Sequence, residues 1–261
     1  MTGEEGGEAK FDDFVVRDRF PQSTATYRLN DGEVREAFDP YLPEGRNLAA
    51  MATLGRDRTP SGALLFYTGV NATLPSDPLD EVTIDFSISV WVKPSSLNAS
   101  GILGRKLANH MYQERVSPSV YLTPEGGVRI AIQDKLNQEY SETYETPFSF
   151  PDAPIGATSS RPTITRVLEP HVWTHLVIVK FGDTLQLYRN GEPWSMSKYW
   201  PEHHLSGTRA QVLMNFLPDA PFHGSLDDLR FYDIALPRSS VEHLYSNVDP
   251  ELPRGKTQRC V

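Results

Sequence analysis

Turn-forming residues recur at short intervals through most of this chain, and short runs of alternating apolar and polar residues lie between them. Ten such runs without a long helical pattern favour an all-β fold, a two-sheet antiparallel jelly-roll sandwich. The turn Asn190-Gly191 suits a type I′ hairpin, because both of its central residues need positive φ. The expected strands lie in "ATYRL", "GALLFYTGV", "FSISVWVKP", "SGILGRK", "PSVYL", "VRIAIQD", "HVWTHLVIVKF", "TLQLYRNGE", "AQVLMNF" and "SLDDLRFYD".

One short C-terminal helix is expected at residues 237–245, "PRSSVEHLY". Ser239 or Ser240 can cap this helix. Its helical spacing places Val241, Leu244 and Tyr245 on the inward face.

The domain organisation follows from the segments that break the strand rhythm. Residues 1–22 and 249–261 are expected to be polar tails around one domain at 23–248. Two polar segments inside that domain, 134–170 and 195–209, are expected to be long loops, and long loops in a compact domain are usually functional or disordered.

Charge and composition exclude several classes of partner. The 261-residue chain carries a net charge of −9, and it has no cluster of Lys and Arg for phosphate groups, so neither nucleic acid nor an anionic membrane is an expected partner. It has no run of about 18 apolar residues, so no membrane insertion is expected. The acidic start "MTGEEGGEAK" is unlike a secretory signal, which leaves a cytosolic protein or a mature or excised piece of a longer one.

Three stretches, taken in order, resemble the laminin-G-like, concanavalin A-like lectin/glucanase jelly-roll family. They are "FSISVWVKPSSLNASGILGRK", "LEPHVWTHLVIVKFGDTLQLYRNGE" and "FHGSLDDLRFYDIALPRSSVEHLY". The likeness runs from about residue 25 to 245 and is interrupted by 134–170. No single motif is specific, but their order and spacing together carry the resemblance.

The resemblance implies a non-catalytic binding module of an extracellular or cell-surface protein. Such a module recognises carbohydrate or a protein partner through its loops, and many members of the family hold one calcium ion. Because fold alone does not choose a function, two alternatives stay open. One is a structural domain of a larger assembly, which the tails and the terminal Cys260 suggest; the other is a glycoside hydrolase.

Catalytic motifs are not found. A jelly-roll glycosidase needs two carboxylates about 5 to 9 Å apart on one face, and the expected Glu-x-Asp-x-x-Glu string does not occur. The lone Cys260 in a tail is a poor nucleophile. His171 and His175 are expected on one strand about 13 Å apart, too far to share a metal ion, with His175 in a structural role.

Ligand-binding candidates come from the aromatic residues of the two long loops. Aromatic rings stack on sugar rings, and Tyr199, Trp200 and His203 of 195–209 together with Tyr144 of 134–170 are the candidates. Packing of each loop against the sheet is the competing explanation. By contrast, the strand tryptophans Trp91 and Trp173 are expected in the core.

The adjacent acidic residues of "SLDDLRFYD" raise the question of a metal. Strand alternation puts Asp227 inward with Leu229 and Phe231, and it puts Asp228 on a solvated face, where it can pair with Arg230.

The resemblance implies that Asp227 contributes to a calcium site. The second ligand position of the family reads Tyr67 or Thr68 here, which departs from the pattern, and Asn71 or Asp31 can supply an oxygen instead. The alternative is that Asp227 accepts backbone hydrogen bonds and binds no metal, so a weakened or absent calcium site is expected.

Overall fold

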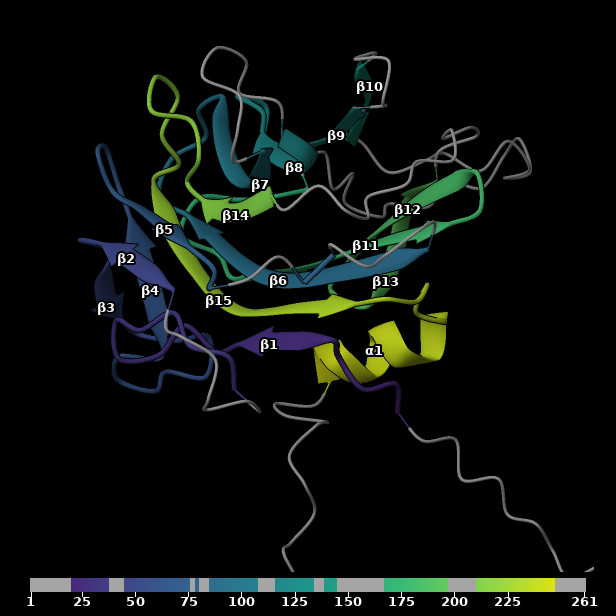
Figure 1. Ribbon diagram of the computed structural model, residues 1–261, viewed down its shortest axis with the longest axis horizontal. Coiled ribbons are helices and arrows are strands. Elements are labelled where there is room, and N and C mark those ends of the chain that lie inside the picture. Colours follow the sequence, from purple (N-terminus) through teal and green to yellow (C-terminus); the bar gives the residue numbers. More distant parts are fainter. Residues whose placement is uncertain are drawn as a thin grey trace, which may run out of the picture.

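Two antiparallel sheets packed face to face make up the fold (Figure 1). The computed structural model describes residues 20–37, 45–75, 78–79, 85–107, 116–133, 139–144, 167–196 and 210–246. Within these residues the elements are fifteen strands and one helix, as the sequence predicts in class.

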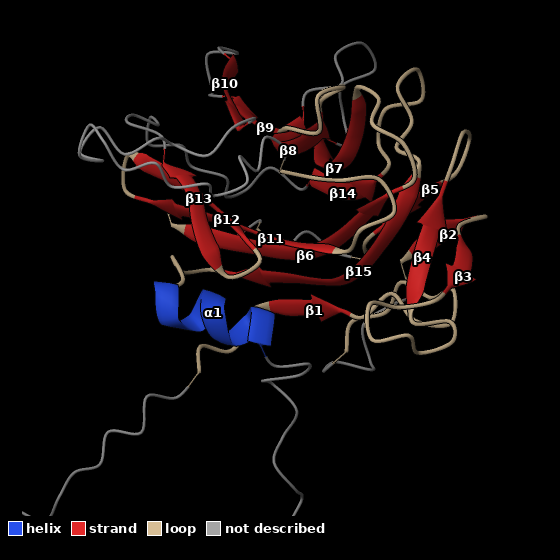
Figure 2. Cartoon of the chain, turned by 180° about the vertical axis from the view of Figure 1, so that it is seen from behind, coloured by secondary structure: helices blue, strands red, loops and turns tan. Residues whose placement is uncertain are grey.

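The first sheet, called sheet A, lies next to the helix (Figure 2). Among the described residues its strands run in the order β13-β12-β11-β6-β15-β4-β3, and β1 pairs with β15 beside this path. The bounds are β1 Ala25–Tyr27, β3 Met51–Thr53, β4 Ala63–Phe66, β6 Phe86–Pro94, β11 Thr174–Phe181, β12 Thr184–Arg189, β13 Glu192–Met196 and β15 Gly224–Tyr232.

The second sheet, called sheet B, covers the other side of the core. Its order over the described residues is β10-β9-β8-β7-β14-β5-β2. The bounds are β2 Arg46–Leu48, β5 Asn71–Thr73, β7 Ser100–Leu107, β8 Val116–Leu122, β9 Val128–Gln133, β10 Glu139–Tyr144 and β14 Ala210–Met214. Strand β10 lies inside 134–170, so part of that segment extends sheet B rather than forming only a loop.

The main core lies between the sheets and is built by strand alternation. In β6, Phe86, Ile88, Val90 and Val92 join this core and are at most 2 % exposed. The residues between them face the outside of sheet A. The alternation seen in the sequence therefore assigns the two faces of this central strand.

Strand β11 is apolar on both of its faces, because the helix α1 (Arg238–Ser246) covers the outer face of sheet A. Leu176 and Ile178 belong to the main core, whereas Val177 and Val179 belong to a second apolar cluster that includes Val241 of the helix. A continuous apolar run is expected of a strand that is buried on both faces.

The predicted turns and helix are largely as expected. Asn190 and Gly191 have φ of 52° and 82°, which fits the type I′ hairpin. The helix begins at Arg238, before both serines, and the carbonyl of Pro237 accepts from the backbone N–H groups of Ser240 and Val241. The prediction that Ser239 or Ser240 caps the helix is therefore wrong.

Candidate functional site

A β-bulge in β15 decides where the two adjacent aspartates lie. Asp227 pairs with Trp91 of β6 and Arg230 pairs with Ser89, so two residues of β15 oppose one residue of β6. Asp228 lies inside the bulge and has a positive φ of 49°. A bulge of this kind inserts one residue and re-aims the side chains beside it.

The bulge overturns the prediction from strict alternation. Leu226, Leu229 and Phe231 all face the main core, although Leu226 and Leu229 are three residues apart. Asp227 does not share that inward face. It lines a polar pocket of about 160 Å³ together with Asp228 and Arg230.

This pocket, called the arginine–aspartate pocket, brings together three separate segments of sheet A. The chain after β1 gives Arg28 and Asn30, and β15 gives the residues of the bulge. The loop between β3 and β4, residues 54–62, closes the pocket with the remaining lining residues, which are Arg56, Asp57, Thr59 and Gly62.

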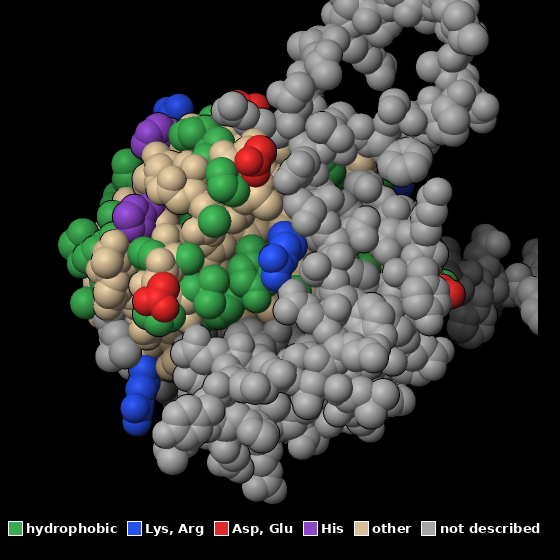
Figure 3. Space-filling view, turned by 90° about the horizontal axis from the view of Figure 1, so that it is seen from above, with side chains coloured by type: hydrophobic (Ala, Val, Ile, Leu, Met, Phe, Trp, Pro, Cys, Tyr) green, Lys and Arg blue, Asp and Glu red, His purple; other side chains and the backbone are tan. Residues whose placement is uncertain are grey.

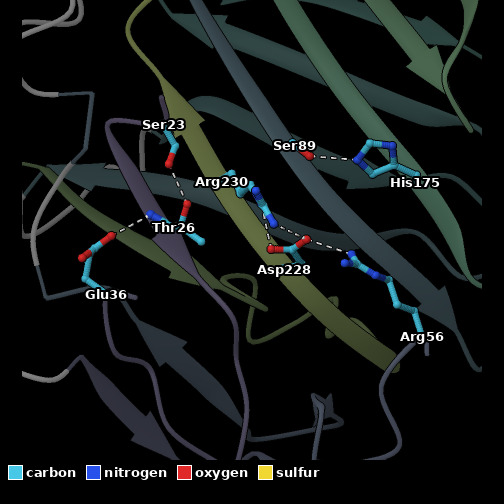
Figure 4. Close-up of polar contacts among 8 residues, drawn as sticks. All are labelled: Ser23, Thr26, Glu36, Arg56, Ser89, His175, Asp228 and Arg230. Atoms are coloured by element: carbon cyan, nitrogen blue, oxygen red, sulfur yellow. Dashed lines mark hydrogen bonds and ion pairs between the residues drawn. The ribbon is translucent and has the colours of Figure 1, made fainter. Parts of the chain in front are cut away.

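Asp228 is held by two guanidinium groups (Figure 4). Arg230 donates from Nε and Nη2 at 2.8 and 3.0 Å, and Arg56 donates from Nη1 at 2.8 Å. The predicted pair of Asp228 with Arg230 is confirmed. The prediction of a solvated face is wrong, because Asp228 and Arg230 are only 8 % and 2 % exposed.

Asp227 is in a different electrostatic environment. Its Oδ2 accepts the backbone N–H of Arg56 at 3.2 Å. Burial raises the pKa of this carboxyl from 3.8 to about 7, and the nearby negative charges of Asp228 and Asp57 act in the same direction against the opposing charge of Arg56. The predicted alternative, a carboxyl that accepts a backbone hydrogen bond from a neighbouring loop, describes this contact.

A calcium ion does not fit the donor set of this pocket. Calcium takes six to eight oxygen ligands, whereas Asp228 already accepts three N–H groups and three guanidinium groups line the space. In the part of the chain that the structure describes, no group of three or more His, Cys, Asp or Glu side chains is placed to hold a metal ion.

The other predicted calcium ligands do not line this pocket. Asn71 is in β5 of sheet B, opposite Leu48, whereas Asp227 is in sheet A. Asp31 is an exposed turn residue with φ of 55°, and it is not among the residues that line the pocket. Tyr67 and Thr68 form the turn between β4 and β5, and the Thr68 hydroxyl contacts His223 at 2.9 Å.

An aromatic stack continues from the pocket along the outer face of sheet A. The Arg56 guanidinium lies 4.8 Å from the ring centre of Trp91, and Trp91 stacks on His175 at 4.9 Å and on Tyr245 at 5.8 Å. Trp91 is half-buried on this outer face, and Trp173 is half-buried beside Lys93. Neither tryptophan belongs to the core clusters, which corrects that prediction.

His175 has the structural role that the sequence predicts. It is 1 % exposed, and its Nε2 lies 2.9 Å from the hydroxyl of Ser89. Burial lowers its pKa from 6.5 to about 3, so the ring is neutral in the folded protein. His171 precedes β11 in a turn with φ of 63°, so the two histidines do not share a strand as predicted.

A second candidate site lies on the outer face of sheet B, called the aromatic row. Val120, Leu122, Val128 and Ile130 fill the main core, so Tyr121 and Arg129, which alternate with them, face outward.

The members of the aromatic row contact one another. The Arg129 guanidinium lies 4.7 Å from the ring centre of Tyr121, and Phe216 meets Tyr121 edge-on at 5.3 Å. Phe216 can lie over β7 because position 101 is Gly: a Cβ there would be 2.7 Å from its ring. All three side chains of the row are half-buried.

The surface around sheet B has no dominant charge where the structure describes it. In the view from above, hydrophobic side chains gather beside a basic group, and charged side chains are otherwise scattered singly (Figure 3). The aromatic row itself combines the ring surface of Tyr121 and Phe216 with the guanidinium of Arg129.

The residues that the sequence predicts to bind ligand are placed only in part. Tyr199, Trp200 and His203 lie outside the described residues. Tyr144 ends β10 opposite Val128, one position from the pair of Thr143 with Arg129, and its side chain is outside the described part. The prediction for these four residues stays a prediction.

Sequence reasoning missed the aromatic row, although a signal for it was present. The runs "SVYL" and "VRIAI" alternate cleanly, and this alternation places Tyr121 and Arg129 opposite the apolar face. The contact with Phe216 was not visible, because it depends on how β14 lies beside β7.

The two packed antiparallel sheets and the helix on sheet A define a jelly-roll fold. The chain belongs to the laminin G group of the concanavalin A-like lectin/glucanases superfamily, whose family model matches residues 67–242. The predicted family resemblance is confirmed. A comparison with curated proteins found no match.

Solved structures with a similar fold include sugar-binding and receptor-binding domains. Domain 4 of AbnA, an extracellular arabinanase from Geobacillus stearothermophilus, solved with arabinotriose, is 19 % identical with a TM-score of 0.59, covering 86 % of this chain and 98 % of that domain. The binding domain of Paraclostridial Mosquitocidal Protein 1 is 16 % identical with a TM-score of 0.60, covering 85 % and 51 %.

The ligand-binding domain of botulinum neurotoxin serotype D, solved with N-acetylneuraminic acid, is 13 % identical with a TM-score of 0.60. The match covers 86 % of this chain and 50 % of that one. At these identities the likeness shows the fold alone. Among the described helices, none is long and apolar enough to cross a membrane.

Proposed function

We propose that this protein is a non-catalytic carbohydrate-binding module, and that a glycan lies across the aromatic row of sheet B. The observation that carries the proposal is the outward-facing set of Tyr121, Phe216 and Arg129. Family membership and the sugar-bound similar structures support it.

The chemistry of the aromatic row matches that of a sugar. A sugar ring has an apolar C–H face that packs on aromatic rings, and hydroxyl groups that both donate and accept hydrogen bonds. Tyr121 and Phe216 supply ring surface, and the guanidinium of Arg129 beside them is a hydrogen-bond donor group. Because the guanidinium already stacks on Tyr121, the donors and the ring are held in one orientation.

The test is binding to a panel of plant and animal polysaccharides, followed by Tyr121→Ala on any polysaccharide that binds. Losing one aromatic contact of about 1.5 kcal/mol weakens binding roughly tenfold. Phe181→Ala is the matched control, because Phe181 is a 64 % exposed aromatic residue at the end of β11 and is expected to leave binding unchanged.

Trp200→Ala tests the predicted loop site in the same assay. Loss of binding in Tyr121→Ala with retention in Phe181→Ala supports the aromatic row. If Tyr121→Ala binds like the wild type while Trp200→Ala does not, the glycan is held by the loop instead. If no polysaccharide is retained, carbohydrate binding itself is refuted, and a protein partner becomes the better assignment.

The location of the module is suggested by one of the similar structures. The similar arabinanase domain is part of a protein that is described as extracellular. We therefore propose that this chain acts outside the cell as one part of a larger protein. Mass spectrometry of the culture medium and of cell extracts tests this location.

A second candidate, glycoside hydrolysis, is favoured by one observation in the arginine–aspartate pocket. A neutral carboxyl near an ionised one is the usual pairing for glycosidic acid catalysis, and the pKa of Asp227 is raised to about 7 beside Asp228. Release of reducing sugar from the same panel, abolished by Asp227→Asn, would establish this activity. The absence of release would leave the binding function alone.

A further inference from the structure

The side chain of Arg56 joins three parts of the fold at the arginine–aspartate pocket. From the loop 54–62 its Nη1 donates to Asp228 of β15 at 2.8 Å, and its backbone N–H donates to Asp227 at 3.2 Å. Its guanidinium covers the ring of Trp91 in β6 at 4.8 Å. Trp91 in turn stacks on Tyr245 of α1, so one cation connects loop, sheet and helix.

The pocket already contains positive charge on its own side chains. Its lining carries three arginines, at 28, 56 and 230, and three aspartates, at 57, 227 and 228. A divalent ion in this pocket would be repelled by three guanidinium groups. To bind Asp228 it would also have to displace the Arg56 and Arg230 N–H groups that already bond this carboxylate. The planar guanidinium suits the site better, because it can pair with a carboxylate and stack on an aromatic ring at once.

We propose that Arg56 is the resident cation of this pocket and holds the loop 54–62 on sheet A in place of a divalent metal ion. The module then keeps its fold without calcium. This differs from the calcium site that the family resemblance implies, and the difference comes from the residues of this chain.

Arg56 is also expected to be costly to remove. Asp228 is 8 % exposed, so the loss of one of its two partners leaves a buried charge that is only partly neutralised. The backbone hydrogen bond to Asp227 and the stacking on Trp91 hold the loop in the same place, and both depend on the position of residue 56.

The experiment is thermal unfolding of the wild type, Arg56→Ala and Arg58→Asn, each in EDTA and in millimolar calcium. Arg58 is an exposed arginine of the same loop with φ of 67°, and Asn tolerates that backbone conformation, which makes it the matched charge control. The expected result is no calcium effect on the wild type, a Tm about 6 °C or more lower in Arg56→Ala, and little change in Arg58→Asn.

Calcium titration calorimetry of the wild type keeps the test valid if Arg56→Ala does not fold. A rise in the wild-type Tm with calcium, or heat of calcium binding that Asp228→Asn removes, would overturn the proposal, because a ligand of the native state must stabilise it. Equal Tm values for Arg56→Ala and Arg58→Asn would overturn it as well. Neither the Tm nor the heat of calcium binding depends on a glycan, so these experiments test Arg56 independently of the proposed carbohydrate binding.

Discussion

Replacing Asp227 by Asn is predicted to change how stability depends on pH. The folded-state pKa of this carboxyl is raised from 3.8 to about 7, mainly by burial. Between these values the folded protein holds a proton that the unfolded chain has released, so its contribution to the free energy of unfolding falls as pH rises from 3.8 to about 7. At about 1.4 kcal/mol per pH unit, the whole change amounts to about 4 kcal/mol.

His175 changes the free energy of unfolding in the opposite direction over an overlapping pH range. Its pKa is lowered from 6.5 to about 3, so the unfolded chain binds the extra proton and stability is lost as pH falls from 6.5 towards 3. From about pH 4 to 6.5 the two effects nearly cancel in the wild type. Asp227→Asn removes one of them and exposes the acid sensitivity due to His175.

The assay is urea unfolding of the wild type and Asp227→Asn at pH 4.5, 6 and 8. Asn keeps an oxygen that can accept the backbone N–H of Arg56. The difference in unfolding free energy between the wild type and the variant therefore reports the titration of Asp227 alone. Relative to the wild type, the variant is expected to gain stability steadily with pH, by up to about 4 kcal/mol. Asp219→Asn, at an exposed loop residue, controls for the loss of one negative charge. A stability difference between the variant and the wild type that stays constant from pH 4.5 to 8 would contradict the raised pKa of Asp227.

Two further substitutions test local geometry. Gly101→Ala places a Cβ 2.7 Å from the ring of Phe216, so it is expected to displace that ring and weaken glycan binding while costing about 1 kcal/mol of stability in urea unfolding. Asn190→Ala is expected to cost about 2 kcal/mol, because Asn190 accepts the backbone N–H of His175 at 2.9 Å with φ of 52°. Asn190→Gly, which tolerates that φ, should cost less, and equal losses would contradict this account.

The fold was predictable from the sequence wherever one residue type determines the local geometry. Asn190-Gly191 specifies its hairpin, because few residue pairs tolerate two positive φ values. The alternation in β6 specifies the two faces of a central strand. The strands β2, β3, β5 and β10 and nearly all of β13 lie outside the ten expected runs, because three to six polar or mixed residues carry no clear period.

The candidate sites were less predictable, because they depend on breaks in the regular pattern. Strict alternation failed at Asp227, where the bulge lets Asp228 take positive φ and shifts the register. Trp91 is expected in the core because it lies in a strand, whereas its register opposite His175 and Asp227 puts it on the outer face of sheet A. Arg56 lies 171 residues from Asp227 along the chain, and no local signal connects the two.

The most direct test of the proposed binding function is amide chemical-shift mapping of the labelled protein during titration with a bound oligosaccharide. We expect the perturbed amides to cluster on β8, β9 and residues 215–217, around Tyr121, Arg129 and Phe216. Perturbations confined to the outer face of sheet A, or none at saturating sugar, would contradict it.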